Sequence, residues 1–233
     1  MPLQEGMLFS NELNEESYIN QRILLFNRKP NKKFIEETLE LLSLKHEVLR
    51  TSFARMDNSY QVVYKNRKIE FSVFEYNNET EYNSIIRSQE KRPFDLEKDV
   101  LIRFSLLKGF DTEYKLMIIS HHIILDGWSV DILLNDFIYI YEQLENGNEY
   151  DELYDTILFE KEDMVSYGDF VSYVNSIDHD NAKNYWKELL SDFENETILP
   201  ETGSNSNSNQ NGVFELIIEA NLINSIYRYN VSA

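Results

Sequence analysis

Short apolar runs alternate with polar stretches along this chain and predict a set of strands. The clearest runs are residues 18–26, 100–107 and 113–120. They are rich in aliphatic, β-branched and aromatic side chains, as strands are. The second and third are joined by KGFDT, a compact connection with turn-forming residues, so we expect an antiparallel hairpin. Three further runs, separated by short polar stretches, predict a meander over residues 50–54, 59–65 and 70–76.

Apolar residues at helical spacing predict helices between these strands. One helix is expected to begin after Asn31, a good N-cap residue, and to extend over residues 32–48. Further helices are predicted over residues 2–13, 79–91, 128–147, 166–176 and 179–193. Gly147 is well placed to close the helix that starts at Trp128. Helices mixed with antiparallel hairpins favour an α+β sandwich, in which helices flank a mixed, mostly antiparallel sheet.

These elements divide the chain unequally. Nearly all of them lie within residues 1–199. Residues 200–212, PETGSNSNSNQNG, are too polar to bury enough surface for order and predict a flexible linker or loop. Residues 213–233 are predicted to form one strand and one short helix, which is too little for a domain. We expect them either to pack back on the first part or to begin a second lobe.

The charge of the chain narrows the classes of partner. With 41 acidic and 22 basic residues, its net charge of -19 disfavours nucleic acid and anionic membranes as partners. Cysteine is absent, which excludes disulfides, thiolate nucleophiles and cysteine-bound metals. The first residues have no signal-peptide pattern, and no stretch approaches the roughly 20 apolar residues of a membrane helix. A cytoplasmic location is the resulting expectation.

One polar interruption of an apolar strand carries candidate chemistry: SHHIILDGWS, residues 120–129. Side chains alternate along a strand, so His121 and His122 are expected to face opposite ways. A histidine at a strand end, ahead of a helix, suits acid–base work near neutral pH. Asp126 can orient an imidazole, cap the next helix or pair with an arginine. Gly127 gives a substrate room to approach the main chain. Together these residues fit an acyl-transfer site without its own nucleophile.

Two other interpretations of the same stretch stay open at this point. It also fits a plain turn followed by a capped helix. A metal site built on His122 and Asp126 is the third interpretation, but no local motif supplies the further ligand that such a site needs.

The stretch HHIILDG resembles the HHxxxDG motif of the condensation domains of nonribosomal peptide synthetases, in the superfamily of chloramphenicol acetyltransferase. PLQEGMLF resembles the family's opening motif, and KHEVLRTSF resembles its RHxxLRTxF motif with Lys for the first Arg. YGDFVSY is similar to a YxDY-like motif with Phe for a Tyr, and NYWKELL and ILP follow in the family's order. The resemblance covers nearly the whole chain and implies that residues 1–199 are the N-terminal lobe of such a domain and that residues 213–233 are the strand and helix that begin a truncated C-terminal lobe.

In this family, two lobes of similar fold enclose a tunnel that admits two 4'-phosphopantetheine arms. Donor and acceptor peptidyl carrier proteins carry these arms, so the resemblance implies no cofactor and no metal bound by the lobe itself. The acceptor amine attacks the donor thioester and forms an amide, without an acyl-enzyme. Adenylation domains of the same assembly line and the C-terminal lobe are the other implied partners. We expect this lobe to fold but to be inactive alone, unless another chain completes a split enzyme.

The resemblance also implies roles for individual residues. His122 matches the motif's second histidine and is expected to act as a general base or to position the attacking amine. His121 is expected to support the strand end through a hydrogen bond. Asp126 is expected to form a buried ion pair with Arg50. Gly127 would supply backbone room or an N–H group to the site.

The remaining polar and aromatic residues are expected to have structural roles. Trp128 is expected to pack and Ser129 to cap the helix that follows. His46 and His179 are expected at the surface. The apolar side chains at helical spacing in residues 133–141 are expected in the core.

Three relatives compete with the amide-forming interpretation. Epimerisation domains usually lack Gly after the motif's Asp, whereas Gly127 is present. Heterocyclisation domains replace the paired histidines with an aspartate-based motif. The third alternative is not an enzyme: it is a relative that docks carrier proteins but catalyses no reaction.

Overall fold

The computed structural model describes residues 2–14, 16–55, 59–110 and 113–193 of the 233-residue chain. The described residues divide into two units, the first ending at residue 177 and the second beginning at residue 178. Helix α7 (His179–Leu189), which the sequence predicts, is the described element of the second unit. The linker predicted at residues 200–212 and the strand and helix predicted at residues 213–233 lie outside the described residues.

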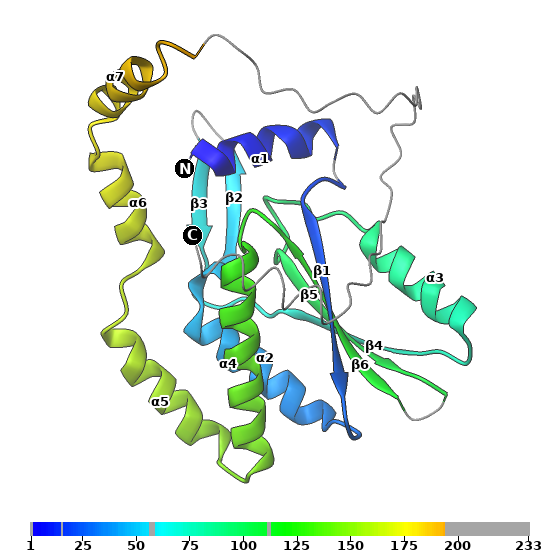
Figure 1. The fold of residues 1–233 in the computed structure, drawn as a ribbon. Helices are drawn as coiled ribbons and strands as arrows, with labels where there is room; N and C mark the ends of the chain where they lie inside the picture. The colour runs from blue at the N-terminus through cyan, green and yellow to red at the C-terminus, as the bar shows by residue number, and fades with distance from the viewer. Residues whose placement is uncertain (1, 15, 56–58, 111–112, 194–233) are drawn as a thin grey trace, which may run out of the picture. The chain divides into compact units, whose positions relative to one another are not determined.

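The main sheet of the first unit has four strands in the order β1-β6-β5-β4 (Figure 1). They are β1 (Ile19–Phe26), β4 (Glu70–Glu75), β5 (Ile102–Lys108) and β6 (Tyr114–His121). Strand β6 pairs antiparallel with both β1 and β5, so the predicted hairpin is confirmed. The two central strands, β5 and β6, are almost entirely buried, and for that reason their sequences are nearly continuous apolar runs.

The predicted meander is wrong in its last strand. Strands β2 (Thr51–Arg55) and β3 (Ser59–Val63) form a separate antiparallel sheet of two strands. Strand β4 leaves them and pairs parallel with β5 at the edge of the main sheet. Helix α3 (Glu79–Glu90) provides the long crossover that a parallel pair requires. Alternation of side chains identifies a strand, but it does not say which neighbour the strand pairs with.

Four predicted helices form close to their expected bounds. These are α1 (Pro2–Leu13), α3, α4 (Gly127–Glu145) and α6 (Tyr167–Ser176). Gly147 follows α4 with a φ of 93°, the left-handed conformation that closes a helix and that glycine adopts without strain.

Helix α2 (Lys32–Lys45) is shorter than predicted. Its N-terminus is capped by Asn31, whose side-chain oxygen accepts a hydrogen bond of 3.0 Å from the Lys33 amide. The backbone is extended at His46, and a single turn of 3-10 helix, Glu47–Arg50, then leads into β2. The apolar spacing continues through this turn, which is why the sequence predicts a longer helix.

Helix α5 (Tyr150–Glu162) is not predicted by the apolar pattern. Its first turn is acidic, and Ile157 is its one fully buried side chain. A helix that touches the core through so narrow a stripe has only a weak hydrophobic signal.

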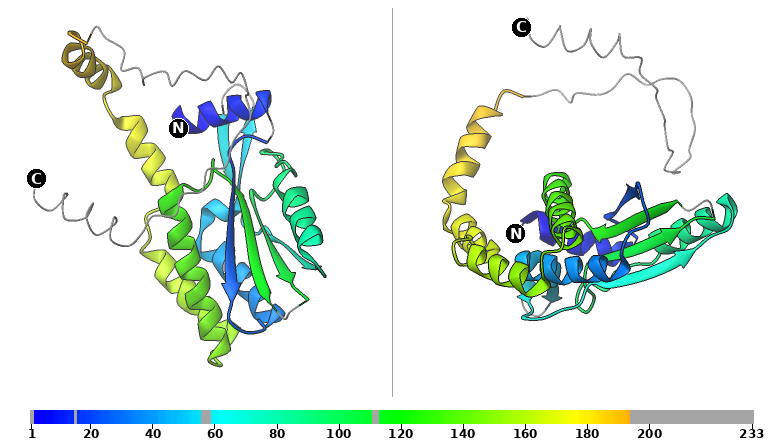
Figure 2. Two further views of the ribbon diagram at one scale, coloured as in Figure 1. Left: turned by 45° about the vertical axis from the view of Figure 1, so that its right-hand side comes forward. Right: turned by 90° about the horizontal axis from the view of Figure 1, so that it is seen from below.

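The core lies between the main sheet and the pair of helices α2 and α4, and in both Figure 1 and the left view of Figure 2 the strands lie between α4 and α3. Phe137 of α4 stacks on Phe104 of β5 with 6.0 Å between ring centroids, and Tyr141 stacks on Phe137 at 6.2 Å. The prediction that this face of α4 is core is confirmed for Leu133, Phe137 and Tyr141, which are buried. Ile138 is the exception, since 44% of it is exposed.

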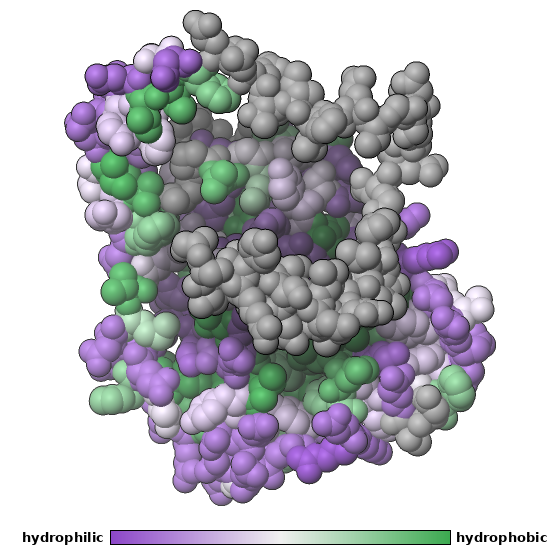
Figure 3. Space-filling model, in the orientation of Figure 1, coloured by the Kyte–Doolittle hydropathy of each residue, from purple (hydrophilic) through white to green (hydrophobic). Residues whose placement is uncertain are grey.

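The surface is mostly hydrophilic but not uniformly so. Apolar side chains of α5, α6 and their connection stay exposed, among them Phe159, Val165 and Phe170, and green patches mark the left edge of Figure 3. Within the part of the chain that the structure describes, no helix combines the length and the apolar character required to cross a bilayer.

Candidate active site

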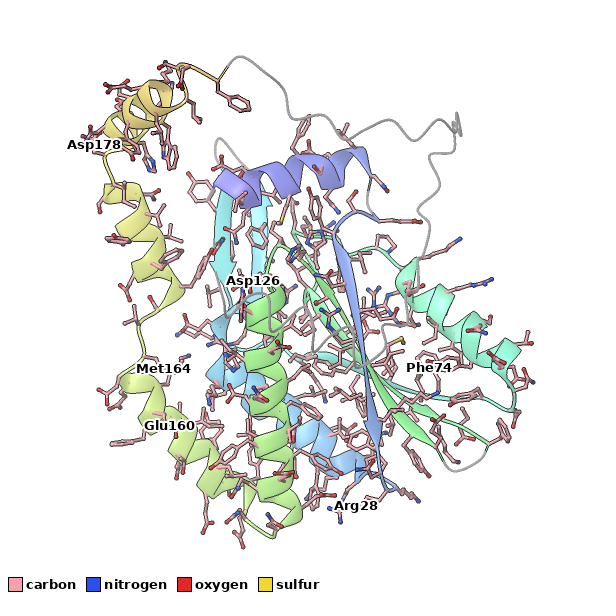
Figure 4. All side chains as sticks on the ribbon, in the orientation of Figure 1. Arg28, Phe74, Asp126, Glu160, Met164 and Asp178 are labelled. Carbon is pink, nitrogen blue, oxygen red and sulfur yellow. The ribbon has the colours of Figure 1, made fainter. Side chains whose placement is uncertain are left out.

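The paired histidines lie where β6 ends and the chain turns into α4. His121 is the last residue of β6 and pairs with Ile19 of β1. Residues 122–124 then form a turn, and α4 begins at Gly127. Figure 4 shows Asp126 at the end of α4 that faces this turn. The strand end, the turn and the helix N-terminus thus place the motif's polar residues in one short segment.

His121 is completely buried and holds the turn. Its Nδ1 accepts a hydrogen bond of 3.1 Å from the Ile123 amide, so in the neutral ring the proton is on Nε2. The edge of Phe94 lies against the ring with 6.5 Å between centroids. Burial lowers the pKa of His121 to about 4, and the charge of His122 contributes a smaller part of that shift. His121 is therefore neutral at physiological pH and inaccessible to a substrate.

His122 is only partly buried and has the opposite arrangement of protons. Its backbone amide donates to the Tyr18 carbonyl at 2.7 Å. Its Nδ1 lies 2.6 Å from the Leu125 carbonyl oxygen, which can only accept a hydrogen bond. In the neutral ring the proton is therefore on Nδ1, and Nε2 carries a lone pair. No described residue gives Nε2 a hydrogen bond, so it is the atom available for proton transfer or for orienting an amine.

Two glutamines that the sequence analysis did not identify brace the same turn. The Gln4 side-chain amide, on α1, donates to the Ile123 carbonyl at 3.1 Å. Gln61 of β3 donates in turn to the Gln4 side-chain oxygen at 2.6 Å. Gln4 lies in the PLQEGMLF motif, and its place in that motif could have identified it as a candidate from the sequence. Gln61 belongs to no motif, so the sequence offered no such indication for it. The turn is thereby connected to the small β2–β3 sheet.

Asp126 does not form the predicted buried ion pair. It is exposed and acts as the N-cap of α4. Its Oδ1 accepts from the Ser129 amide at 2.7 Å and from the Ser129 hydroxyl at 2.6 Å. These bonds, the hydroxyl first, hold the pKa of the Asp126 carboxyl below its ordinary value. The capped-helix interpretation of this carboxylate is the one that the structure shows.

Arg50, the other expected partner in that pair, is buried and occupied elsewhere. Its Nε donates to the Ser43 carbonyl at 2.7 Å, and another guanidinium nitrogen donates to the Tyr64 carbonyl. Its nearest carboxylate among the described ion pairs is Glu47, at 3.7 Å. The prediction of an Asp126–Arg50 ion pair is therefore wrong, because Asp126 is bonded to Ser129 and Arg50 is bonded to the carbonyls of Ser43 and Tyr64.

The first turn of α4 is open to solvent. A methyl group added to Gly127 would meet nothing within 4 Å, so the neighbouring protein atoms leave room at this position. Trp128 is 84% exposed, which contradicts the prediction that it packs. Ser129 does not occupy the cap position itself but donates its hydroxyl to Asp126. The open side of the motif is thus formed by Gly127 and Trp128.

The other two histidines have different environments. His179 is exposed on α7, as predicted. The surface prediction is wrong for His46, which is partly buried with its Nε2 2.7 Å from a carboxylate oxygen of Asp136 on α4. Burial lowers the pKa of His46 in spite of that carboxylate. Lys45 reaches the other oxygen of Asp136 at 2.9 Å, so this cluster joins α2 to α4.

Among the described residues, no group of three or more His, Cys, Asp or Glu side chains is arranged to hold a metal ion. The metal interpretation of His122 and Asp126 therefore finds no further ligand in that part of the chain. The acid–base interpretation depends instead on the free Nε2 of His122.

Comparison with curated proteins finds peptide synthetases. A linear gramicidin synthase of Brevibacillus parabrevis is 30% identical over 235 residues, which cover 97% of this chain and 4% of that protein. Bacitracin synthase 3 of Bacillus licheniformis is 29% identical over 205 residues, which cover 85% of this chain and 3% of that protein. The chain thus spans a few per cent of the length of these relatives.

Solved structures show the same fold at low sequence identity. The starter condensation domain of the rhizomide synthetase, in a mutant form, aligns with a TM-score of 0.68 and 15% identity, over 84% of this chain and 48% of that one. The X-domain from teicoplanin biosynthesis aligns with a TM-score of 0.63 and 19% identity, over 84% and 44% of the two chains. These likenesses confirm the predicted α+β sandwich of the chloramphenicol acetyltransferase type.

A family model described as the condensation domain matches residues 1–224, almost the whole chain. That match agrees with the order of the motifs and with the shared fold. The chain therefore belongs to the condensation domains of nonribosomal peptide synthetases.

Proposed function

We propose that the chain is the N-terminal lobe of a condensation domain that forms an amide bond between two carrier-bound substrates. The observation that carries the proposal is the state of His122, whose Nδ1 is bonded to a main-chain carbonyl while its Nε2 has no described partner. An imidazole fixed in this way presents a proton acceptor in a known direction. The open first turn of α4 beside it leaves space for a substrate.

In the proposed reaction, the amine nitrogen of the acceptor aminoacyl thioester attacks the carbonyl carbon of the donor thioester. Nε2 of His122 either takes the proton that this nitrogen loses or accepts a hydrogen bond that orients it. The C–N bond forms, the C–S bond breaks, and the donor phosphopantetheine leaves as a thiol that takes up the proton. No covalent acyl-enzyme is needed, in agreement with the absence of cysteine from the chain.

The same proposal includes the partners of the lobe. Donor and acceptor peptidyl carrier proteins would deliver the two 4'-phosphopantetheine arms, and adenylation domains would load them. The C-terminal lobe would supply the other wall of the tunnel. The chain covers 48% of the aligned starter condensation domain, which supports a need for further residues. We expect residues 1–233 to be inactive without them.

Two relatives define the alternatives. The epimerization domain from the third module of tyrocidine synthetase B aligns with a TM-score of 0.55 at 21% identity, so the fold also serves another chemistry. A second solved structure is a complex of the X-domain with OxyB from teicoplanin biosynthesis. This likeness to a domain that binds a protein partner supports the second candidate function, a module that docks carrier proteins without catalysing amide formation.

The test uses the whole condensation domain with donor- and acceptor-loaded carrier proteins and measures the new dipeptidyl thioester by mass spectrometry. We expect product from the wild type and a loss of roughly 100-fold or more in His122→Ala, as removal of a general base causes. His121→Asn, which can still accept from the Ile123 amide, is the matched control and should keep most of the activity. Full activity in His122→Ala would remove this residue from catalysis. No product from any matched pair of substrates would favour the binding module.

A further inference from the structure

Tyr18 occupies an unusual position directly ahead of the candidate base. It is the last residue of the turn that leads into β1, and its φ of 62° lies in the left-handed region. Among the described residues it is the one non-glycine residue with a positive φ. Such a conformation is strained for a residue with a bulky side chain and is favoured for glycine or asparagine. A tyrosine here therefore has a use that outweighs the backbone strain.

The main chain of Tyr18 is bonded to the main chain of His122. Its carbonyl accepts the His122 amide at 2.7 Å, one residue beyond the last antiparallel pair, Ile19 with His121. This hydrogen bond extends the β1–β6 ladder past the end of β6 and into the turn. A glycine or an asparagine could provide the same carbonyl, so this bond does not by itself explain the tyrosine.

The ring of Tyr18 contacts both imidazoles. Its centroid lies 6.4 Å from that of His121 and 6.5 Å from that of His122, with the planes inclined by 47° and 38°. These separations are within the range of aromatic contacts. The residue is 42% exposed, so its ring is at the border between the buried His121 and the accessible His122. Its hydroxyl has no hydrogen bond to a described residue, so the aromatic ring is the part that makes the contact.

We propose that Tyr18 is a positioning residue for His122. The ring restricts rotation of the imidazole, while the bond from Nδ1 to the Leu125 carbonyl fixes its other side. With both in place, the Nδ1-protonated tautomer is maintained and Nε2 stays free. The catalytic meaning of this arrangement rests on the proposed function, but the arrangement itself does not.

The first experiment uses the 233-residue chain and needs no activity. The ring nitrogens of His122 are followed by NMR at neutral pH in the wild type and in Tyr18→Phe, Tyr18→Asn and Tyr18→Gly. We expect the Nδ1-protonated tautomer in the wild type and in Tyr18→Phe, and a mixture of tautomers in the other two. Asn and Gly tolerate the left-handed conformation, so their melting temperatures should not fall sharply. If one of these two variants does not fold, the other is used for the comparison. Tyr173→Asn, at an exposed position on α6, is the control for loss of a tyrosine.

The second experiment measures amide formation in the whole condensation domain. We expect kcat to fall roughly tenfold to a hundredfold in Tyr18→Asn with KM little changed, as misplacement of a reacting group causes. Tyr18→Phe should retain the wild-type kcat. An unchanged His122 spectrum together with an unchanged kcat in Tyr18→Asn would overturn the positioning role. If the wild type forms no product at all, the proposed function fails, and the NMR spectra alone then decide the role of Tyr18.

Discussion

Two segments carry the most recognisable motifs of this chain, and they use their charged residues differently. The arginine segment, residues 45–53, places Arg50 in the interior, where its guanidinium donates to main-chain carbonyls. The histidine segment, residues 120–129, places Asp126 at the surface, where it caps its own helix. The arginine segment thus holds the fold together, whereas the histidine segment combines a buried support, His121, with an accessible imidazole, His122.

The difference shows how two charges that belong together in a motif pattern can be satisfied separately. Asp126 is bonded to Ser129, three residues away, and Arg50 is bonded to the carbonyls of Ser43 and Tyr64, seven and 14 residues away. Partners at such short sequence separations require little extra ordering of the chain. A buried ion pair would in addition require the desolvation of an exposed carboxylate. Presence of both residues in family motifs therefore does not establish that they touch.

The largest effect is expected in the arginine segment. Arg50→Met keeps much of the apolar stem but removes the donors to the Ser43 and Tyr64 carbonyls. We expect the free energy of unfolding to fall by about 3 kcal/mol, because buried acceptors are left unpaired. Chemical denaturation of the chain measures it. Arg28→Met, which removes an exposed pair with Glu145, is the control and should change the free energy by well under about 1 kcal/mol. Equal losses in the two variants would contradict a clamping role for Arg50.

His121, the buried histidine of the histidine segment, should make the free energy of unfolding depend on pH. His121 has a folded-state pKa of about 4 against an ordinary value of 6.5. Above pH 6.5 the ring is neutral in both states, and between 6.5 and 4 only the unfolded chain takes up the proton. The contribution of His121 to the free energy of unfolding should therefore fall by about 3 kcal/mol as the pH falls through this window.

His121→Asn provides the comparison for this pH dependence, because the amide oxygen can still accept from the Ile123 amide. Denaturation curves at several pH values should show a smaller loss in the variant than in the wild type between pH 6.5 and 4. His46, whose pKa is also lowered by burial, contributes the same sign in both proteins and cancels in the difference. Parallel curves for the two proteins would mean that His121 protonates as readily in the fold as in the unfolded chain.

A smaller effect is expected for the carboxylate of the histidine segment. Asp126→Ala removes the N-cap of α4 and should lower the free energy of unfolding by about 1 kcal/mol. Asp126→Asn retains a capping oxygen and should cost much less. Combined with Arg50→Met, the loss should be additive within about 0.5 kcal/mol, since the two residues share no contact. A coupling well above that value in the double-mutant cycle would show that Asp126 and Arg50 interact, and it would contradict the separation seen in the structure.

The smallest change in stability is expected at Gly127. Because an added methyl meets no atom within 4 Å, Gly127→Ala should leave the free energy of unfolding within about 0.5 kcal/mol of the wild type or raise it slightly. If this room serves a substrate, the same variant should reduce amide formation in the whole domain. Wild-type activity in Gly127→Ala would mean that the free space at this position has no part in substrate access.

The residues themselves predict much of the fold for a physical reason. The strands of the main sheet, the hairpin of β5 and β6, the Asn31 cap and the closure of α4 at Gly147 depend on side-chain periodicity and local turn chemistry, which are visible in a linear sequence. Pairing of β4 with β5 and the existence of α5 depend on neighbours far away in the chain or on a narrow contact. The periodicity of a single segment does not contain that information.

For the candidate site, the sequence by itself determined which segment we propose for the chemistry, because two histidines, Asp126 and Gly127 stand together in one short stretch at the end of an apolar strand. Only the tertiary structure decided which of these residues is buried, which is accessible and which partners each one has. His121 is buried, the bond to the Leu125 carbonyl leaves Nε2 of His122 free, and Asp126 and Arg50 are each bonded to other residues. Gln4, Gln61 and Tyr18 reach the turn from other elements, and such contacts arise only when the chain is folded.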